Sequence, residues 1–144
     1  MRYRLNNWKA FVAAGMILLS LATLSFGPSV SAAGHSVTRI TLDPPTPNVL
    51  VHNQKVTISF SYATIQPGGV RIFARPFTGG AATPGYAASG AGISPTGSGT
   101  GTQFFTITSG TVTVDQIRIQ MWNAGQTTLL FEAFLPVHYE FRAP

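Results

Sequence analysis

The chain has 144 residues, enough for one domain with a hydrophobic core and too few for two ordinary domains. It contains no cysteine, which excludes disulfides, thiolate metal sites, a catalytic thiol and a lipid-anchor cysteine. Three of its nine Lys and Arg lie in the first nine residues. The rest of the chain has six Lys and Arg and four Asp and Glu, so its net charge is nearly neutral and does not favour nucleic acid as a partner.

The first 33 residues have the order of a secretory leader. Cations occupy residues 1–9, residues 10–24 are almost wholly apolar, and Val30-Ser31-Ala32 offers small residues at a cleavage site. We expect a helical signal peptide over residues 1–33, cut after Ala32 or Ala33, because the apolar run is short of the about 20 residues that span a membrane. If the leader is not cleaved, it is the only segment that we expect to contact a membrane. The mature protein is therefore expected to be secreted or at the cell surface, with the periplasm as an alternative.

The expected mature domain begins with a strand from Val37 to Leu42. Asp43-Pro44-Pro45-Thr46-Pro47 should end this strand, since proline has no backbone N–H to donate to a sheet. Residues 49–51 follow as a short edge strand.

The central stretch, residues 55–77, predicts two strands joined by a tight turn at Gln66-Pro67-Gly68-Gly69. Apolar and polar residues alternate in both strands, so each has one apolar face. We interpret the pair as a hairpin. The inward residues are Val56, Ile58, Phe60 and Tyr62 in the first strand and Val70, Ile72 and Ala74 in the second.

Residues 78–101 change to Gly, Ala, Ser, Thr and Pro and contain eight of the fifteen glycines. A segment of this composition buries too little apolar surface to offset the conformational entropy that it loses on ordering. We expect a long Gly-rich loop around one short strand near residues 86–89. A loop of this length is either functional or a flexible connection.

The C-terminal part predicts further strands over residues 102–108, 111–122 and 128–141. In the second of these, Val112 and Val114 share one parity while Ile117 and Ile119 share the other, which predicts a bulge or turn at Asp115-Gln116. Residues 123–126 carry a turn signal. The last strand has the longest apolar alternation, and Pro136 within it indicates a bulge or an edge position, where the strand could bend and join both sheets.

This succession of short strands, without helical periodicity after the leader, predicts an all-β fold: one domain over residues 34–144, a two-sheet antiparallel β-sandwich with Greek-key connections. The order of residues 40–45, 54–60 and 137–141 resembles bacterial extracellular immunoglobulin-like or fibronectin type III-like modules. That resemblance implies a non-catalytic spacer or binding module outside the cell.

Catalytic and cofactor signals are weak. Glu132 and Glu140 share one strand face but lie roughly 26 Å apart in extended chain, too far to act on one glycosidic bond. His138 and Glu140 are two residues apart, yet no third ligand is tied to them by spacing, so a solvated polar face is favoured over a metal site. The glycines of residues 90–101 precede a strand and lack a phosphate-binding lysine, which argues against nucleotide binding. We expect no cofactor, no metal and no enzyme activity.

The expected ligand or partner surface is the outer face of the second central strand, with part of a later strand beside it. Aromatic rings and guanidinium groups there could stack on sugars or anchor a protein, unless the Gly-rich loop folds over the rings. The residues are Arg71, Phe73, Arg75, Phe77, Arg118, Trp122 and Tyr86.

The sequence thus favours an extracellular interaction or structural module, whose partner would be a cell-envelope protein. The alternative is a carbohydrate-binding module that uses the Arg and aromatic residues to bind a polysaccharide. A small secreted hydrolase that depends on His138 is a third, weaker hypothesis.

Overall fold

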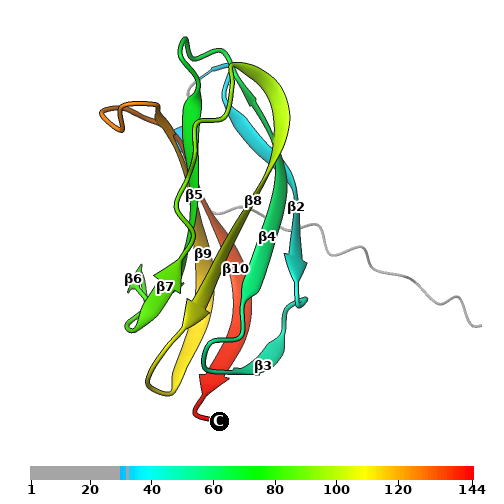
Figure 1. Ribbon diagram of the computed structural model, residues 1–144, viewed down its shortest axis with the longest axis vertical. Coiled ribbons are helices and arrows are strands. Elements are labelled where there is room, and N and C mark those ends of the chain that lie inside the picture. Colours follow the sequence, from blue (N-terminus) through cyan, green and yellow to red (C-terminus); the bar gives the residue numbers. More distant parts are fainter. Residues whose placement is uncertain (1–29, 32) are drawn as a thin grey trace, which may run out of the picture.

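A computed structural model describes Val30, Ser31 and residues 33–144 of the chain. Figure 1 shows that these residues form two β-sheets packed against each other. The expected signal peptide lies outside the described residues, apart from Val30, Ser31 and Ala33. In the described part of the chain, no helix has the length and apolar character needed to cross a membrane.

Six strands form one sheet and four form the other. In the six-stranded sheet the order is β1 (Val30–Ser31), β10 (Leu129–Arg142), β9 (Val112–Asn123), β5 (Val70–Thr78) and β6 (Ala81–Ala82), and β3 (Asn48–Val51) also pairs with β10. In the four-stranded sheet it is β2 (Ser36–Asp43), β4 (Val56–Thr64), β8 (Gly97–Ile107) and β7 (Tyr86–Ala88). All pairs are antiparallel except β3 with β10. The predicted two-sheet antiparallel β-sandwich is confirmed.

The core fills the space between the inner faces of the two sheets. Along β4 and β5 the buried positions alternate with more exposed ones, as a period of two requires. Each large aliphatic side chain buried there contributes about 1.5 to 3 kcal/mol relative to exposure. The fully buried large side chains include Ile58, Phe105, Ile117, Ile119, Met121, Leu135, Tyr139 and Phe141.

The predicted hairpin is wrong, although both of its strands exist. β4 belongs to the four-stranded sheet and β5 to the six-stranded sheet, so residues 65–69 carry the chain from one sheet to the other. The turn forms as expected, with the Gly69 N–H donating to the Gln66 carbonyl at 3.2 Å. A hairpin and a crossover bury the same alternate residues, so the alternation alone could not distinguish them.

The Gly-rich loop is shorter than expected, because β8 begins at Gly97 and pairs with β4 from Gly97 to Phe105. Gly99 and Gly101 lie opposite Tyr62 and Phe60. A Cβ atom at Gly101 would stand 2.6 Å from the Phe60 ring, and one at Gly99 would stand 2.8 Å from the Tyr62 ring. These glycines therefore make room for two aromatic rings that lie across β8.

The phase change predicted in β9 is confirmed. Val114 and Ile117 are both fully buried although they are three residues apart. Gln116 pairs with Pro136 and Val114 with Tyr139, so one residue of β9 faces two of β10 at a bulge. Pro136 lies at this irregularity, as expected, but β10 stays in the six-stranded sheet instead of joining both.

Tyr139 fastens the proline-rich segment after β2 to the core. Its ring is fully buried, and its hydroxyl donates to the Pro44 carbonyl at 2.6 Å. Burial raises the pKa of the Tyr139 phenol to about 12, and the negative charge of Asp43 acts in the same direction. The neutral phenol is therefore the form that the folded protein stabilises.

Gly101→Ala should destabilise the fold by about 1 to 3 kcal/mol, since the added methyl group overpacks against the Phe60 ring. Gly125→Ala is the matched control, because no atom lies within 4 Å of its Cβ position. Urea unfolding monitored by circular dichroism measures both. Equal stability of the two variants would contradict the packing role of Gly101.

Alkaline pH should destabilise the protein through Tyr139. The folded pKa lies above the unfolded value of about 10, so this stabilisation is complete below pH 10 and is lost as the pH approaches 12. Between pH 8 and pH 11 the wild type should lose about 1 kcal/mol more unfolding free energy than Tyr139→Phe. Urea unfolding at the two pH values measures both proteins. An equal loss of unfolding free energy in the wild type and in Tyr139→Phe would refute this assignment.

Candidate functional site

The outer face of β5 and β9 carries the residues that the sequence singled out. Because Val70, Ile72 and Ala74 point into the core, the alternate residues of β5 point outward. β9 lies beside β5, and Arg71 pairs with Trp122 and Arg75 with Arg118. Tyr86 is added from β7, at the edge of the other sheet. We call the seven predicted residues the Arg-aromatic face.

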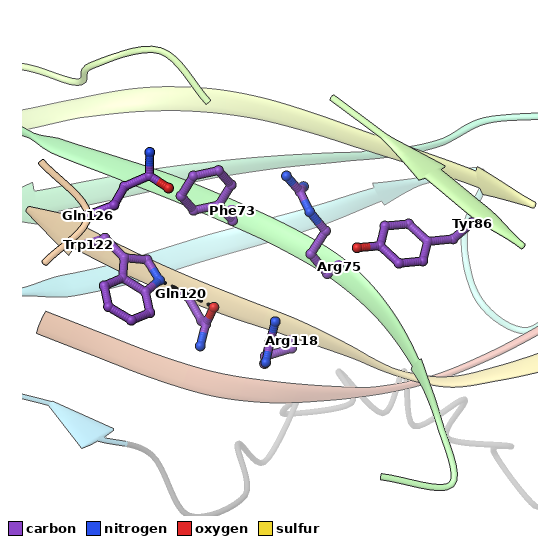
Figure 2. Close-up of a pocket in the computed structure, with 7 residues that line it drawn as sticks. All are labelled: Phe73, Arg75, Tyr86, Arg118, Gln120, Trp122 and Gln126. Atoms are coloured by element: carbon purple, nitrogen blue, oxygen red, sulfur yellow. Dashed lines mark hydrogen bonds between the residues drawn. The ribbon is translucent and has the colours of Figure 1, made fainter. Parts of the chain in front are cut away.

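Part of this face is hollowed into an open depression of about 290 Å³, shown in Figure 2. Five residues of the Arg-aromatic face line it, together with two glutamines. The lining residues are Phe73, Arg75, Tyr86, Arg118, Gln120, Trp122 and Gln126. The sequence reading missed both glutamines. The alternation of β9 could have found Gln120, which lies between Arg118 and Trp122 on the same face, whereas Gln126 belongs to the turn after β9 and gave no such signal.

Arg71 and Phe77 do not line the depression. Arg71 donates to the carbonyls of Ala124 at 2.9 Å and Ala91 at 2.6 Å and thereby joins two loops. Phe77 is buried and packs edge-on against Phe134, with ring centroids 5.6 Å apart. These two residues support the site and offer little surface to a ligand.

Arg75 and Arg118 stand side by side as cross-strand partners. Arg75 lies 5.0 Å from the centre of the Phe73 ring and donates to the Ala74 carbonyl at 2.9 Å. Burial lowers the pKa of the Arg75 guanidinium; the Tyr86 hydroxyl raises it, and the positive charge of Arg118 lowers it again. In Figure 2 the Tyr86 hydroxyl points toward Arg75. Two like charges thus share one wall of the depression.

Arg118 is held by packing. Its guanidinium lies 4.5 Å from the centre of the Phe77 ring, a cation–π arrangement. Its Nε is buried, and no acceptor for it exists among the described residues. Ion pairs within the described part of the chain all involve Glu140, so neither Arg118 nor Arg75 has a carboxylate partner there. Within the described residues, neither guanidinium is therefore neutralised by a direct ion pair.

A short hydrogen-bond relay orients the Trp122 ring. The indole N–H donates to Gln120 Oε1 at 3.3 Å, and Gln120 Nε2 donates to Glu132 Oε2 at 2.5 Å. Glu132, from the neighbouring strand β10, is thereby bound to an amide and not to an arginine. The indole is half-buried, and the remainder of its surface borders the depression.

His138 and Glu140 lie elsewhere, on β10. His138 Nε2 is 3.2 Å from Glu140 Oε1, and Arg142 Nη2 donates to Glu140 Oε2 at 2.5 Å. Hydrogen bonds from Arg142 and then His138 lower the pKa of Glu140. No group of three potential metal ligands is present in the described residues. The three side chains form an exposed row of ion pairs.

A known structure shares this fold. A Niemann-Pick type C2 protein from the Japanese carpenter ant superposes with a TM-score of 0.52, covering 83% of this chain and 98% of that chain at 8% identity. This likeness supports an immunoglobulin-like sandwich and, at such low identity, concerns the fold alone. No protein-family model and no curated protein matches the sequence.

Arg118→Met should stabilise the protein by about 0.5 to 1 kcal/mol, since methionine keeps the packing on Phe77 and removes an uncompensated charge beside Arg75. Arg142→Met, at the exposed ion pair, serves as control and should change stability by less than about 0.5 kcal/mol. Thermal and urea unfolding measure both. A clear loss of stability in Arg118→Met would instead assign Arg118 a structural role.

Proposed function

We propose that the protein is an exported, non-catalytic binding module that binds a saccharide in the depression of the Arg-aromatic face. The observation that supports this most directly is the combination of aromatic rings with amide and guanidinium groups around one hollow. Aromatic rings pack on the apolar faces of sugar rings, while amides and guanidinium groups bond to hydroxyls. The resemblance to bacterial extracellular modules and the predicted leader agree with a role outside the cell.

The size of the depression favours a small ligand over a protein partner. At about 290 Å³ it is near the lower end of small-molecule sites. A protein interface would need about 800 Å² on each partner with an apolar centre. The exposed large apolar residues in the described part of the chain are Val49, Val51, Ile65, Tyr86 and Ile93, and of these only Tyr86 borders the depression.

The lining of the depression also supports a binding role without catalysis. Its polar groups are two guanidinium groups, two amides, an indole N–H and a phenol. Hydrolysis requires a nucleophile with a base, or a pair of carboxyl groups at the reacting bond. Glu132, the acid of the hydrogen-bond relay, accepts a hydrogen bond from Gln120 and is not among the residues that line the depression.

Saccharide binding should change the fluorescence of Trp122, the only tryptophan of residues 34–144. Titration of this domain with a panel of neutral and acidic polysaccharides should shift or quench the emission. Tyr86→Ala should weaken binding by about threefold to tenfold through loss of an aromatic contact. Ile65→Ala, an exposed apolar residue away from the depression, is the control and should bind normally.

Absence of a response to every polysaccharide, with the domain folded by circular dichroism, would refute the proposal. Equal weakening by Tyr86→Ala and Ile65→Ala would also contradict it, because it would place binding outside the depression. Calorimetry repeats the titration for Trp122→Ala, which lacks the fluorophore and should lose most of the binding heat.

A further inference from the structure

We infer that the saccharide is acidic, and that Arg75 and Arg118 together hold its anionic group. The inference rests on the proposed function, because it assigns the chemical class of the ligand of the same depression. The acidic group is a carboxylate, as in a uronic acid, or a sulfate ester; both present oxygen acceptors with a negative charge.

The first observation is the uncompensated charge. Arg75 and Arg118 are cross-strand partners, and like charges directly opposite each other on a sheet are unfavourable. Burial is the main cause of the lowered pKa of Arg75, and the positive charge of Arg118 lowers it further. An anion between them would interact favourably with both, so the same arrangement that costs stability in the free protein favours a negatively charged ligand.

The second observation is the set of free donors on Arg118. No hydrogen bond or ion pair joins its guanidinium to the described part of the chain. Its Nε is buried without an acceptor, so the two Nη groups are the donors that a ligand can reach. The Phe77 ring fixes the group from one side. A guanidinium offers N–H groups in a planar fork that matches a carboxylate with two parallel hydrogen bonds. Arg71, by contrast, already donates to two carbonyls and is not available.

The third observation is where the rings stand. In Figure 2 Trp122 and Phe73 lie on one side of the two arginines and Tyr86 on the other. A sugar ring packed on Trp122 would therefore carry its acidic substituent toward Arg75 and Arg118, and Tyr86 would meet the next part of the chain. Binding to an anionic membrane typically uses a cluster of about four to eight cations, and two arginines are fewer than that.

The test compares polygalacturonate with its fully methyl-esterified form, which has the same ring without the charge. Isothermal titration with the full chain should give at least about tenfold tighter binding of the acid form, the value of one charge-assisted hydrogen bond. Dextran sulfate against dextran provides the second pair. Preference for the charged member of either pair supports the inference, and the stronger preference identifies carboxylate or sulfate.

Variants separate the arginine pair from general attraction. Arg118→Gln should abolish the preference for the acid form while leaving binding of the methyl ester, and Arg118→Lys should restore only part of it because lysine lacks the planar fork. Arg142→Gln removes the same unit charge outside the depression and should keep the preference. Circular dichroism verifies that each variant is folded. If Arg118→Gln does not fold, the same comparison is made with Arg75→Gln.

The outcomes distinguish the two proposals. Equal binding of the charged and uncharged members in both pairs overturns the acidic class and leaves saccharide binding intact. Equal loss in Arg118→Gln and Arg142→Gln also overturns it, because the preference would then be unspecific charge attraction. Failure of every polysaccharide to bind refutes the proposed function itself, and this inference with it.

Discussion

Side chains of β5 and β9 alternate between the interior of the sandwich and its outer face, and this alternation determines where the residues of the depression lie. Ile72, Ala74 and Ile119 are buried between the sheets. Their neighbours Phe73, Arg75 and Arg118 must therefore point outward. A slip of one residue in either strand would bury a guanidinium group in the core. The packing that stabilises the sheet thus also fixes the candidate site on a rigid surface.

The Arg-aromatic face shows how charge is retained on that surface. Phe73 and Phe77 each support one guanidinium group through its flat side, at 5.0 Å and 4.5 Å from the ring centres. Cation–π contacts of this kind contribute about 0.5 to 2 kcal/mol. They leave the Nη donors of Arg118 free, whereas Arg75 Nη1 also donates to the Ala74 carbonyl and to Gln103 Oε1. An ion pair with a carboxylate would have used those donors. The face is consequently ordered without being neutralised.

Alternation in the sequence was sufficient to predict the strands, the inward residues and the change of phase near Asp115. It was also sufficient to gather four of the residues that line the depression, namely Phe73, Arg75, Arg118 and Trp122. It could not assign strands to sheets, because β4 and β5 bury the same residues whether they pair with each other or face each other across the core. Composition wrongly predicted a loop at Gly99 and Gly101. These glycines lie in a strand and leave room for the rings of Tyr62 and Phe60.

Two long-range features of the depression gave no local signal. Tyr86 reaches Arg75 from the edge of the opposite sheet, and such proximity depends on how the two sheets are offset. The distinction between half-buried Phe73 and buried Phe77 depends on Phe134, which is far away in the sequence. Both features arise from tertiary packing, which periodicity along one strand does not encode.

The bulge opposite Asp115 connects the register of β9 to a distant turn. Asp115 Oδ2 accepts a hydrogen bond from the Gly79 N–H at 2.9 Å, and Gly79 lies directly after β5 with φ of 59°. If β9 moved by one position relative to β5, this carboxylate would turn to the opposite side and release that amide. Solvent exchange of the single Gly79 amide proton therefore reports on the alignment of the two strands that carry the arginines, at a residue that does not line the depression.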